Sequence, residues 1–354
     1  MELILDNIVF SLQKAGGISV VWSENMKRLL VDNDIDITCL EYGEQNFLRK
    51  KIHPNDNQII NLIPRLSLKL ERYLNPSINL KKKNVFHSSY YRCIEQPEIY
   101  NITTVHDFTY EYFRTGISKK IHYEQKLKAI RNSEKIICIS ENTKLDLLKF
   151  HPWLPEERIE VIYNGVDETY RVVNDEVDNI PFDNGGYLLY VGDRKSNHKN
   201  FNQAVEASIK VNMPLLLVGS ALSKKEKQYL DFKLNKDYFL LSGITNEELN
   251  LLYNNAFCFL YPSSYEGFGI PILEAQRAGC PIISSNSSSI PEVSGNGAIL
   301  LNEINSDLIS EALNSLRNNN QFKTSLISLG LENSKKFSWD KCFEQTKKVY
   351  LNFK

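Results

Sequence analysis

The sequence predicts an α/β protein with two Rossmann-like domains, each built on a parallel sheet. Short β-branched runs alternate with stretches of helical periodicity along most of the chain, which is typical of doubly wound sheets. At 354 residues the chain is too long for one hydrophobic core. A polar, acidic stretch at residues 170–186 separates the two sets of elements and indicates a linker.

The first set of elements lies in residues 1–170, which we expect to form the N-terminal domain. It opens with an expected strand at residues 2–10, a loop, and a helix at residues 18–30 with apolar residues at helical spacing. The further strands expected in this domain lie at residues 35–42, 84–89, 101–107, 135–140 and 158–165.

Residues 171–336 are expected to form the C-terminal domain, and residues 337–354 a last helix. The expected strands of this domain are residues 186–193, 214–220, 238–243, 256–263 and 280–286. The last stretch is amphipathic, with Trp339, Phe343 and Val349 or Tyr350 near one face.

Composition excludes several classes of protein. Hydrophobic residues make up 42% and charged residues 24% of the chain, and the net charge of −1 does not favour nucleic-acid binding. The six cysteines are scattered without a C-x-x-C pair, which favours reduced thiols over disulfides or a zinc site. Because the N-terminus lacks the features of a signal peptide and no apolar run could span a bilayer, we expect a cytoplasmic protein.

A glycine turn between two acids points to a ligand site. Glu266 and Glu274 flank the turn Gly267-Phe268-Gly269, which joins an expected strand to an expected helix that has Pro271 in its first turn. The free amides of such a turn bind phosphate, and glycine lets the backbone approach closely. The two carboxylates can accept hydrogen bonds from sugar hydroxyls on either side of a diphosphate. This pattern describes a nucleotide sugar, although a structural Gly-x-Gly turn is common in α/β folds.

Two cations follow an earlier strand of the same domain. Arg194 and Lys199 lie in the loop "GDRKSNHKN", where they could offset the charge of a pyrophosphate without a divalent metal. Taken alone, such a pair is also typical of a solvated charged loop. The Asp-x-Asp spacings at Asp32, Asp34 and Asp36 match a polar turn before a strand better than a metal site.

Together these residues resemble the retaining nucleotide-sugar glycosyltransferases of family 4, which have the GT-B fold. Glu266 and Glu274 fit the family's E-x7-E motif, and Arg194 and Lys199 fit its donor-phosphate pair. The segments "VIYNGVD" and "ISENTKLDL" and the closing "FSWDKCFEQTKKVY" are also similar to family segments. The resemblance implies two Rossmann-like domains facing each other across a cleft, and a C-terminal helix that crosses back to the N-terminal domain.

The resemblance also implies a role for each matched residue. Glu274 would hold the donor ribose, and Glu266 would contact the transferred sugar. Backbone at Gly243 and Ile244 would meet the base, and His106 would reach the donor sugar, although a His–Asp dipeptide at a strand end is often structural. The backbone groups expected around the diphosphate and sugar are those of Gly16, Gly17, Gly267, Phe268, Gly269 and Ile270. One departure from the family pattern is Asp193, which precedes Arg194.

The implied reaction retains the configuration at the anomeric carbon and requires neither a metal nor another cofactor. His106, Glu266, Arg194 and Lys199 are the residues expected at the reacting groups. We expect a hexose donor, with GDP-mannose first and a UDP-hexose second. We expect the acceptor to be a saccharide, free or linked to a lipid pyrophosphate, in bacterial O-antigen, capsule or exopolysaccharide synthesis.

Residues 49–92 carry ten Lys/Arg and two Asp/Glu, which is an excess of eight positive charges. Such a segment could touch an anionic membrane surface, or it could be a solvated basic face.

Three alternatives stay open. A nicotinamide dehydrogenase also has Rossmann-like domains, but no complete G-x-G-x-x-G motif occurs in the chain. A sugar-nucleotide epimerase would act on the donor without an acceptor. A non-catalytic protein would bind a nucleotide sugar without turnover.

Overall fold

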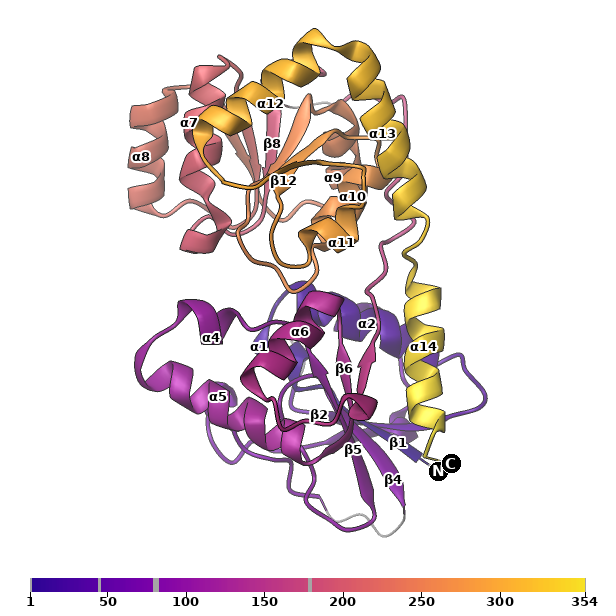
Figure 1. Ribbon diagram of the computed structural model, residues 1–354. Helices are drawn as coiled ribbons and strands as arrows, with labels where there is room; N and C mark the ends of the chain where they lie inside the picture. Colours follow the sequence, from indigo (N-terminus) through magenta and orange to yellow (C-terminus); the bar gives the residue numbers. More distant parts are fainter. Residues whose placement is uncertain (1, 44–45, 79–82, 178–179, 354) are drawn as a thin grey trace. The chain divides into compact units, whose positions relative to one another are not determined.

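The computed structural model describes residues 2–43, 46–78, 83–177 and 180–353. The chain divides into two compact units (Figure 1). The N-terminal unit comprises Met1–Gly165 with Trp339–Lys354, and the C-terminal unit comprises Val166–Ser338. The polar stretch at residues 170–186 contains no helix or strand among its described residues.

The N-terminal unit is built on a seven-stranded parallel sheet with strand order β3-β2-β1-β4-β5-β6-β7. Its core is made of aliphatic side chains that point from the sheet toward the covering helices, such as Leu3, Val85 and Ile137. The strands are β1 (Glu2–Asp6), β2 (Asp36–Glu41), β3 (Ile59–Asn61), β4 (Asn84–Ser88), β5 (Ile99–Val105), β6 (Ser133–Cys138) and β7 (Ile159–Val161).

The helices of this unit include the last helix of the chain. The α-helices are α1 (Ile8–Leu12), α2 (Gly17–Leu29), α3 (Leu68–Glu71), α4 (Thr109–Phe113), α5 (Gly116–Arg131), α6 (Glu141–Phe150) and α14 (Trp339–Leu351). Short 3-10 turns are η1 (Arg49–Lys51), η2 (Asp56–Gln58) and η3 (Glu156–Arg158).

The expected strand at residues 2–10 is shorter than predicted. β1 ends at Asp6, and Ile8–Leu12 form the short helix α1. The side chain of Asn7 marks the break, because it donates to Glu41 Oε1 (2.9 Å) and accepts from the indole N–H of Trp22 (2.7 Å). The sequence did not distinguish strand from helix here, because a short apolar run such as Ile8-Val9-Phe10 fits a buried strand and a buried helix equally well.

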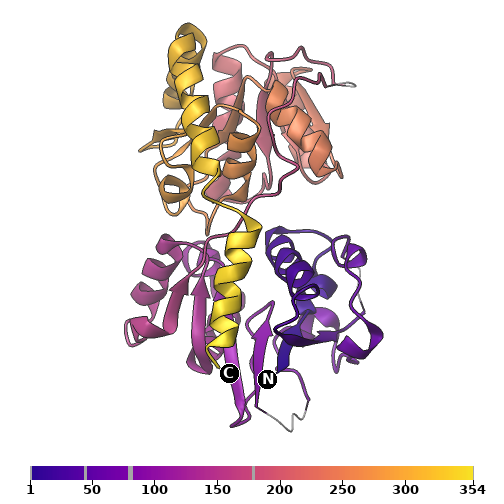
Figure 2. The same ribbon diagram turned by 90° about the vertical axis from the view of Figure 1, so that its right-hand side faces the viewer.

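α14 completes the core of the N-terminal unit. Trp339, Phe343, Val349 and Tyr350 are all buried on one face, as the amphipathic pattern predicts. Figure 2 shows α14, in yellow, lying along this unit, where it packs against α2.

The C-terminal unit is built on a six-stranded parallel sheet with strand order β10-β9-β8-β11-β12-β13. Its strands are β8 (Leu188–Val191), β9 (Leu215–Val218), β10 (Tyr238–Leu241), β11 (Cys258–Tyr261), β12 (Ile282–Ser285) and β13 (Ile299–Leu301). Its helices are η4 (Asn197–Lys199), α7 (Phe201–Lys210), α8 (Lys224–Leu234), α9 (Asn246–Asn255), α10 (Ile270–Arg277), α11 (Ile290–Ser294), α12 (Ser306–Asn318) and α13 (Asn320–Ser334).

Each sheet has one point where the strand order reverses. In the N-terminal unit this point lies between β1 and β4, and in the C-terminal unit between β8 and β11. Ligands of open α/β sheets bind at such a point, beyond the carboxyl ends of the strands. In the C-terminal unit, a ligand is therefore expected at the loops that follow β8 and β11.

Candidate functional site

A pocket of about 150 Å³ lies at the reversal point of the C-terminal sheet. It is formed by the carboxyl ends of β8 and β11, by the loops that follow them, and by the first turn of α10. The lining residues are Tyr190, Val191, Gly192, Asp193, Lys199, Tyr261, Pro262, Ser263 and Pro271. The position matches the expectation for a phosphate-containing ligand on a doubly wound sheet.

Lys199 and Glu266 form an ion pair beside this pocket. Lys199 Nζ lies 2.5 Å from Glu266 Oε1, and it also lies 5.8 Å from the centroid of the Tyr261 ring. The two side chains are about one-fifth or less exposed, at 21% and 13%. Burial, followed by the charge of Glu266 and a hydrogen bond to it, raises the pKa of Tyr261. The structure therefore brings one predicted cation and one predicted carboxylate into direct contact.

The glycine turn has the geometry that its sequence predicts. Gly269 is the N-cap of α10 and has φ +106°, a left-handed conformation that favours glycine. A Cβ at Gly269 would also lie 3.3 Å from Ile272 Cδ1. Pro271 stands in the first turn of α10, where it has no intrahelical donor to lose. The amide of Ile272 donates to the carbonyl oxygen of Gly269 (3.0 Å), and the positive end of the α10 dipole lies beside the pocket.

Glu274, one turn further along α10, lies against tyrosine hydroxyls. Tyr253 Oη donates to Glu274 Oε2 at 3.1 Å, and Tyr170 also hydrogen-bonds to this carboxylate. Burial raises the pKa of Glu274 to about 7, although the two tyrosine hydrogen bonds oppose the shift. The group is therefore neutral below about pH 7, and its ionised form above that pH could accept further hydroxyl groups.

Arg194 lies in the loop after β8, and its guanidinium bonds to groups that follow β9 in the chain. Its Nη2 donates to the carbonyl oxygen of Ser220 (2.6 Å) and its Nε donates to Glu226 Oε1 (3.2 Å). Arg194 is 8% exposed, and its Nη1 has no hydrogen-bond partner among the described residues. Glu226 also caps α8 through Ser223. Lys199 lines the pocket, whereas Arg194 is not among the lining residues.

Gly243 and Ile244, predicted to meet a base, lie between β10 and α9. Gly243 has φ +71°, and Thr245 caps α9 by accepting from the amide of Glu248. β10 is the edge strand of the sheet, two strands away from β8. These backbone groups therefore occupy the carboxyl edge of the sheet that also carries the pocket.

A run of serines holds the loop that carries Glu266, and the sequence analysis missed it. Ser288 Oγ accepts from the amide of Glu266 at 2.8 Å. The hydroxyl of Ser289 lies 2.9 Å from the carbonyl oxygens of both Glu266 and Phe268. Ser284 and Ser285 donate to the backbone carbonyls of Tyr261 and Ser263. The signal was present in the sequence as "SSNSSS" (residues 284–289), which begins in the last two residues of β12, the neighbour of β11.

The predicted glycines of the N-terminal unit begin a helix. Gly16 is the N-cap of α2 and Gly17 is its first residue. A Cβ at Gly16 would lie 2.5 Å from Gln13 Oε1, whereas a Cβ at Gly17 would meet no atom within 4 Å. Gly17 therefore stands at an open helix N-terminus, as a phosphate-facing position requires.

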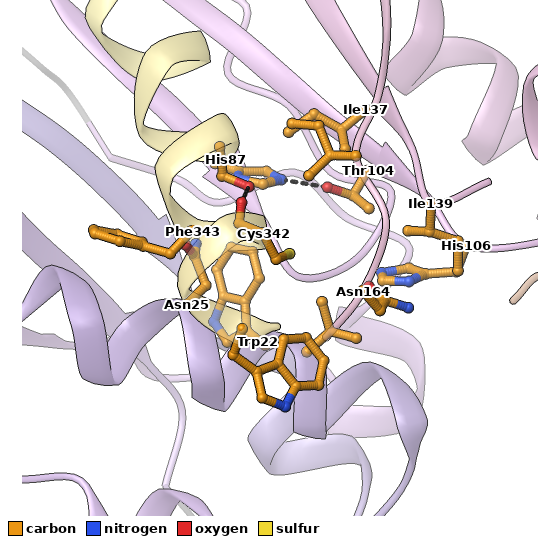
Figure 3. A pocket seen from close by; sticks show the side chains of 14 residues that line it. Trp22, Asn25, His87, Thr104, His106, Ile137, Ile139, Asn164, Cys342 and Phe343 are labelled. Atoms are coloured by element: carbon orange, nitrogen blue, oxygen red, sulfur yellow. Dashed lines mark hydrogen bonds between the residues drawn. The ribbon is translucent and has the colours of Figure 1, made fainter. Parts of the chain in front are cut away.

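His106 follows the end of β5 and lines a small cavity of about 30 Å³ in the N-terminal unit (Figure 3). His87, in the same cavity, bonds to Thr104 (2.9 Å) and to Tyr350 of α14 (2.8 Å). Burial, with a contribution from Lys126, lowers the pKa of His106 to about 4, and Asp107 opposes the shift. His106 is therefore neutral near pH 7. The cavity has room for a water molecule or two rather than for a sugar.

The Asp-x-Asp spacings have a structural explanation. Lys347 Nζ of α14 lies 2.5 Å from Asp32 Oδ2 and 2.6 Å from Asp34 Oδ2. These two carboxylates therefore secure the last helix to the turn before β2.

The family model for Glycosyltransferase Family 4 matches residues 15–170, and the model for Glycosyl transferases group 1 matches residues 174–331. The chain belongs to glycosyltransferase family 4. Its two parallel α/β units give it the GT-B fold of this family.

Several relatives of this family-4 glycosyltransferase are named mannosyltransferases. O-antigen chain mannosyltransferase B of Escherichia coli is 32% identical over 173 residues, which are 47% of this chain and 45% of the relative. O-antigen chain mannosyltransferase RfbU of Salmonella typhimurium is 28% identical over 205 residues, 56% of each chain. The matches thus span about half the length of these relatives. An uncharacterized glycosyltransferase of Methanocaldococcus jannaschii is 26% identical over 99% of this chain and 98% of its own.

Solved structures agree on the fold. HepE of Anabaena, in complex with UDP and glucose, superposes with a TM-score of 0.73 at 15% identity over 99% of both chains. Sucrose-phosphate synthase of Thermosynechococcus elongatus superposes with a TM-score of 0.79 at 15% identity, over 99% of this chain and 98% of its own.

Proposed function

We propose that this family-4 enzyme transfers a hexose from a nucleotide sugar to a saccharide acceptor with retention of configuration. The observation that carries the proposal is the pocket at the reversal point of the C-terminal sheet. There Lys199, Glu266 and the N-terminus of α10 meet around a space that a diphosphate and a sugar would share.

The contacts support a separate role for each of the donor-binding groups. The amides of Gly267, Phe268, Gly269 and Ile270 would bind the diphosphate, and Lys199 would exchange its contact with Glu266 for a phosphate oxygen. Glu266 would then be available to the hydroxyls of the transferred sugar. Glu274, between its tyrosines, would accept the ribose hydroxyls, with the base near Gly243 and Ile244.

The chemical step that we propose is a front-face substitution. The bond from the anomeric carbon to the diphosphate oxygen breaks as the acceptor oxygen bonds to the same face of that carbon. The departing diphosphate takes the proton of the acceptor hydroxyl. Lys199, Arg194 and the helix amides would stabilise the charge that develops on the diphosphate, so that no metal is needed for this purpose. The unpartnered Nη1 of Arg194 supports its part in this role.

The N-terminal unit would supply Gly16, Gly17 and His106 to the donor. His106 is neutral because burial lowers its pKa to about 4, so it would act as a hydrogen-bonding group for a sugar hydroxyl rather than as a cation. The open first turn of α2 at Gly17 would face phosphate.

Mannose is the hexose that we propose, with GDP-mannose as donor and a UDP-hexose as the alternative. The names of the relatives, two O-antigen chain mannosyltransferases, support mannose and a role in bacterial surface-polysaccharide synthesis. The acceptor would be a saccharide or a lipid-pyrophosphate-linked saccharide.

We also propose that the enzyme works in the cytoplasm at an anionic membrane surface. The basic segment 49–92 supports this, because Lys50, Lys51 and Lys69 are exposed. Lys81 and Lys82 of this segment lie outside the described residues. No helix of the described residues is long and apolar enough to cross a membrane.

The test is a thermal-shift screen of the purified protein, without metal, against GDP-mannose, UDP-glucose, UDP-galactose, UDP-N-acetylglucosamine and NAD(H). One nucleotide sugar should raise the melting temperature, and Glu274→Ala should abolish that shift. Glu303→Ala, an exposed glutamate of the same unit, is the matched control and should keep it. A shift with NAD(H) alone would overturn the proposal.

The screen selects the donor for a turnover assay. Sugar transfer that requires an added acceptor supports a transferase. Conversion of the donor without acceptor would identify an epimerase, and binding without any turnover would identify a non-catalytic protein.

A further inference from the structure

A groove of about 560 Å³ separates residues 65–75 of the N-terminal unit from α5. The side chain of Gln125 on α5 donates to the carbonyl oxygen of Arg72, which fixes the two walls together. Apolar side chains form much of the groove, and basic ones stand at its rim. The lining residues are Arg65, Tyr73, Leu74, Asn75, Tyr91, Cys93, Lys120, Ile121, Glu124, Gln125, Lys128 and Ala129.

Both walls carry aliphatic side chains that point into solvent. On α5, at the edge of the N-terminal unit in Figure 1, Ile117 is 79% exposed and Ile121 is 45% exposed. These positions are one helical turn apart and therefore share a face. Within residues 65–75, Leu66 is 50% and Leu70 is 52% exposed, and Ile63, which precedes this wall in the chain, is 91% exposed. Of these aliphatic residues Ile121 lines the groove itself, and the others flank the groove-lining residues in the chain or on the helix. Scattered exposed leucines are ordinary, but this set forms an aliphatic patch.

Positive charge is interspersed with these aliphatic residues. Lys69 and Lys120 are exposed. Arg65 pairs with the buried Glu71 (2.8 Å), and Lys128 pairs with Glu95 (2.6 Å). Glu124 is the acidic residue among the groove-lining residues themselves. Because Glu71 and Glu95 pair with Arg65 and Lys128, the positive charge that remains for a partner here, among the described residues, is that of Lys69 and Lys120.

We propose that this groove and its two walls are the surface by which the enzyme docks on an anionic lipid bilayer. The aliphatic side chains would enter the headgroup region while Lys69 and Lys120 meet lipid phosphates. A protein partner fits less well, because the buried centre of a protein interface is poor in lysine and rich in aromatic residues. Here the five exposed aliphatic residues named above are Ile or Leu and Lys69 and Lys120 lie near them, while the aromatic residues that line the groove are Tyr73 and Tyr91.

This inference rests on the membrane contact proposed above and extends the contact surface to α5. It does not depend on the transferase activity. The experiment therefore uses the full chain without any donor, and compares sedimentation with vesicles that contain phosphatidylglycerol and with phosphatidylcholine vesicles.

The wild-type protein should bind the phosphatidylglycerol vesicles and not the phosphatidylcholine vesicles. The double variant Ile117→Gln/Ile121→Gln should bind the anionic vesicles roughly tenfold more weakly, because it removes two inserted aliphatic side chains. Lys69→Gln/Lys120→Gln should also lose about tenfold, with a weaker dependence on salt. Leu145→Gln on α6, a residue that is 65% exposed in the same unit, should bind as the wild type does.

Four results would overturn the inference. The first is no binding to either vesicle, and the second is equal binding to both. The third is a loss of binding in Lys50→Gln/Lys51→Gln while both groove variants bind normally, which would place the membrane contact at residues 49–51 and remove it from the groove. The fourth is an oligomer, measured by light scattering, that the Ile117/Ile121 variant dissociates while vesicle binding is unchanged. Melting temperatures of all variants show whether they are folded.

Discussion

Glu274 combines burial with two tyrosine partners, so this one residue would make the proposed donor site sensitive to pH near neutrality. Burial raises its pKa to about 7, and only the ionised carboxylate can accept two ribose hydroxyls. The dissociation constant of GDP-mannose should therefore be about tenfold higher at about pH 6 than at about pH 8. Calorimetric titration across this range measures it. A flat profile in the wild-type protein would contradict the assigned role.

The same residue predicts a stability effect that needs no ligand. Because the folded-state pKa lies above the ordinary value of 4.5, the folded protein prefers the neutral acid. The stability that this group contributes is fully present below about pH 4.5 and is lost as pH rises to about 7. Glu274→Gln should therefore raise the melting temperature at about pH 8 and change it little at about pH 4. Equal stabilisation by Glu274→Gln at both pH values would contradict this account.

Ser289 donates to two backbone carbonyls of the loop that carries Glu266. Ser289→Ala leaves the carbonyl oxygens of Glu266 and Phe268 without this donor and should cost about 1–3 kcal/mol of unfolding free energy. It should also weaken nucleotide-sugar binding, since Glu266 loses its position. Ser287→Ala, in the same run, is the control and should be close to wild type. Urea unfolding and donor titration of both variants test this, and equal effects would contradict it.

At the scale of single elements, two glycines at helix starts should respond differently to alanine. Gly269→Ala should destabilise the protein by about 1–2 kcal/mol, because φ is +106° and the new Cβ would crowd Ile272. Gly17→Ala should leave the melting temperature unchanged or slightly raised, since its Cβ would meet no atom within 4 Å. If Gly17 faces the donor phosphate, the alanine variant should still lose turnover. Full turnover in a stable Gly17→Ala protein would remove Gly17 from the site.

Most strands and the E-x7-E helix could be predicted from the sequence because their signals are local, whereas the short strands β3 and β13 were not expected. α10 begins at Ile270 beside the predicted turn, and Gly279 ends it with φ +70°. The boundary between β1 and α1 could not be predicted, because the bonds of Asn7 to Glu41 and Trp22 join residues far apart in the chain. The serine contacts were missed for the same reason, since they depend on β12 lying next to β11.

The side-chain partners of the predicted site residues were also beyond the sequence. The pairing of Lys199 with Glu266, and of Arg194 with Glu226, joins residues 67 and 32 positions apart. The family motif indicated that these residues share a site, but not that Arg194 is buried or that Lys199 contacts a carboxylate. The roles assigned to them stay predictions until donor binding is measured.

At the scale of the whole molecule, α14 is part of the N-terminal core although it follows the C-terminal unit in the chain. Trp339→Ala removes a side chain that is 5% exposed and should cost about 3–5 kcal/mol of unfolding free energy. Asp340→Ala, whose side chain is 79% exposed, should change it by no more than about 1 kcal/mol. The remaining tryptophans, Trp22 and Trp153, also lie in the N-terminal unit, so fluorescence follows the unfolding of that unit. An unchanged fluorescence midpoint in Trp339→Ala would contradict this account.

Because α14 belongs to the N-terminal unit but is synthesised last, the two units cannot be completed in the order in which their synthesis begins. Residues 166–338 can complete their sheet as soon as they emerge, because every strand of that sheet is contiguous in the chain. The unit whose synthesis starts first must wait for α14 before Trp339, Phe343 and Tyr350 can close its core. The nascent N-terminal unit therefore leaves part of α2 and of its sheet uncovered while nearly half the polypeptide is still being translated, which is the interval in which a chaperone would be needed most.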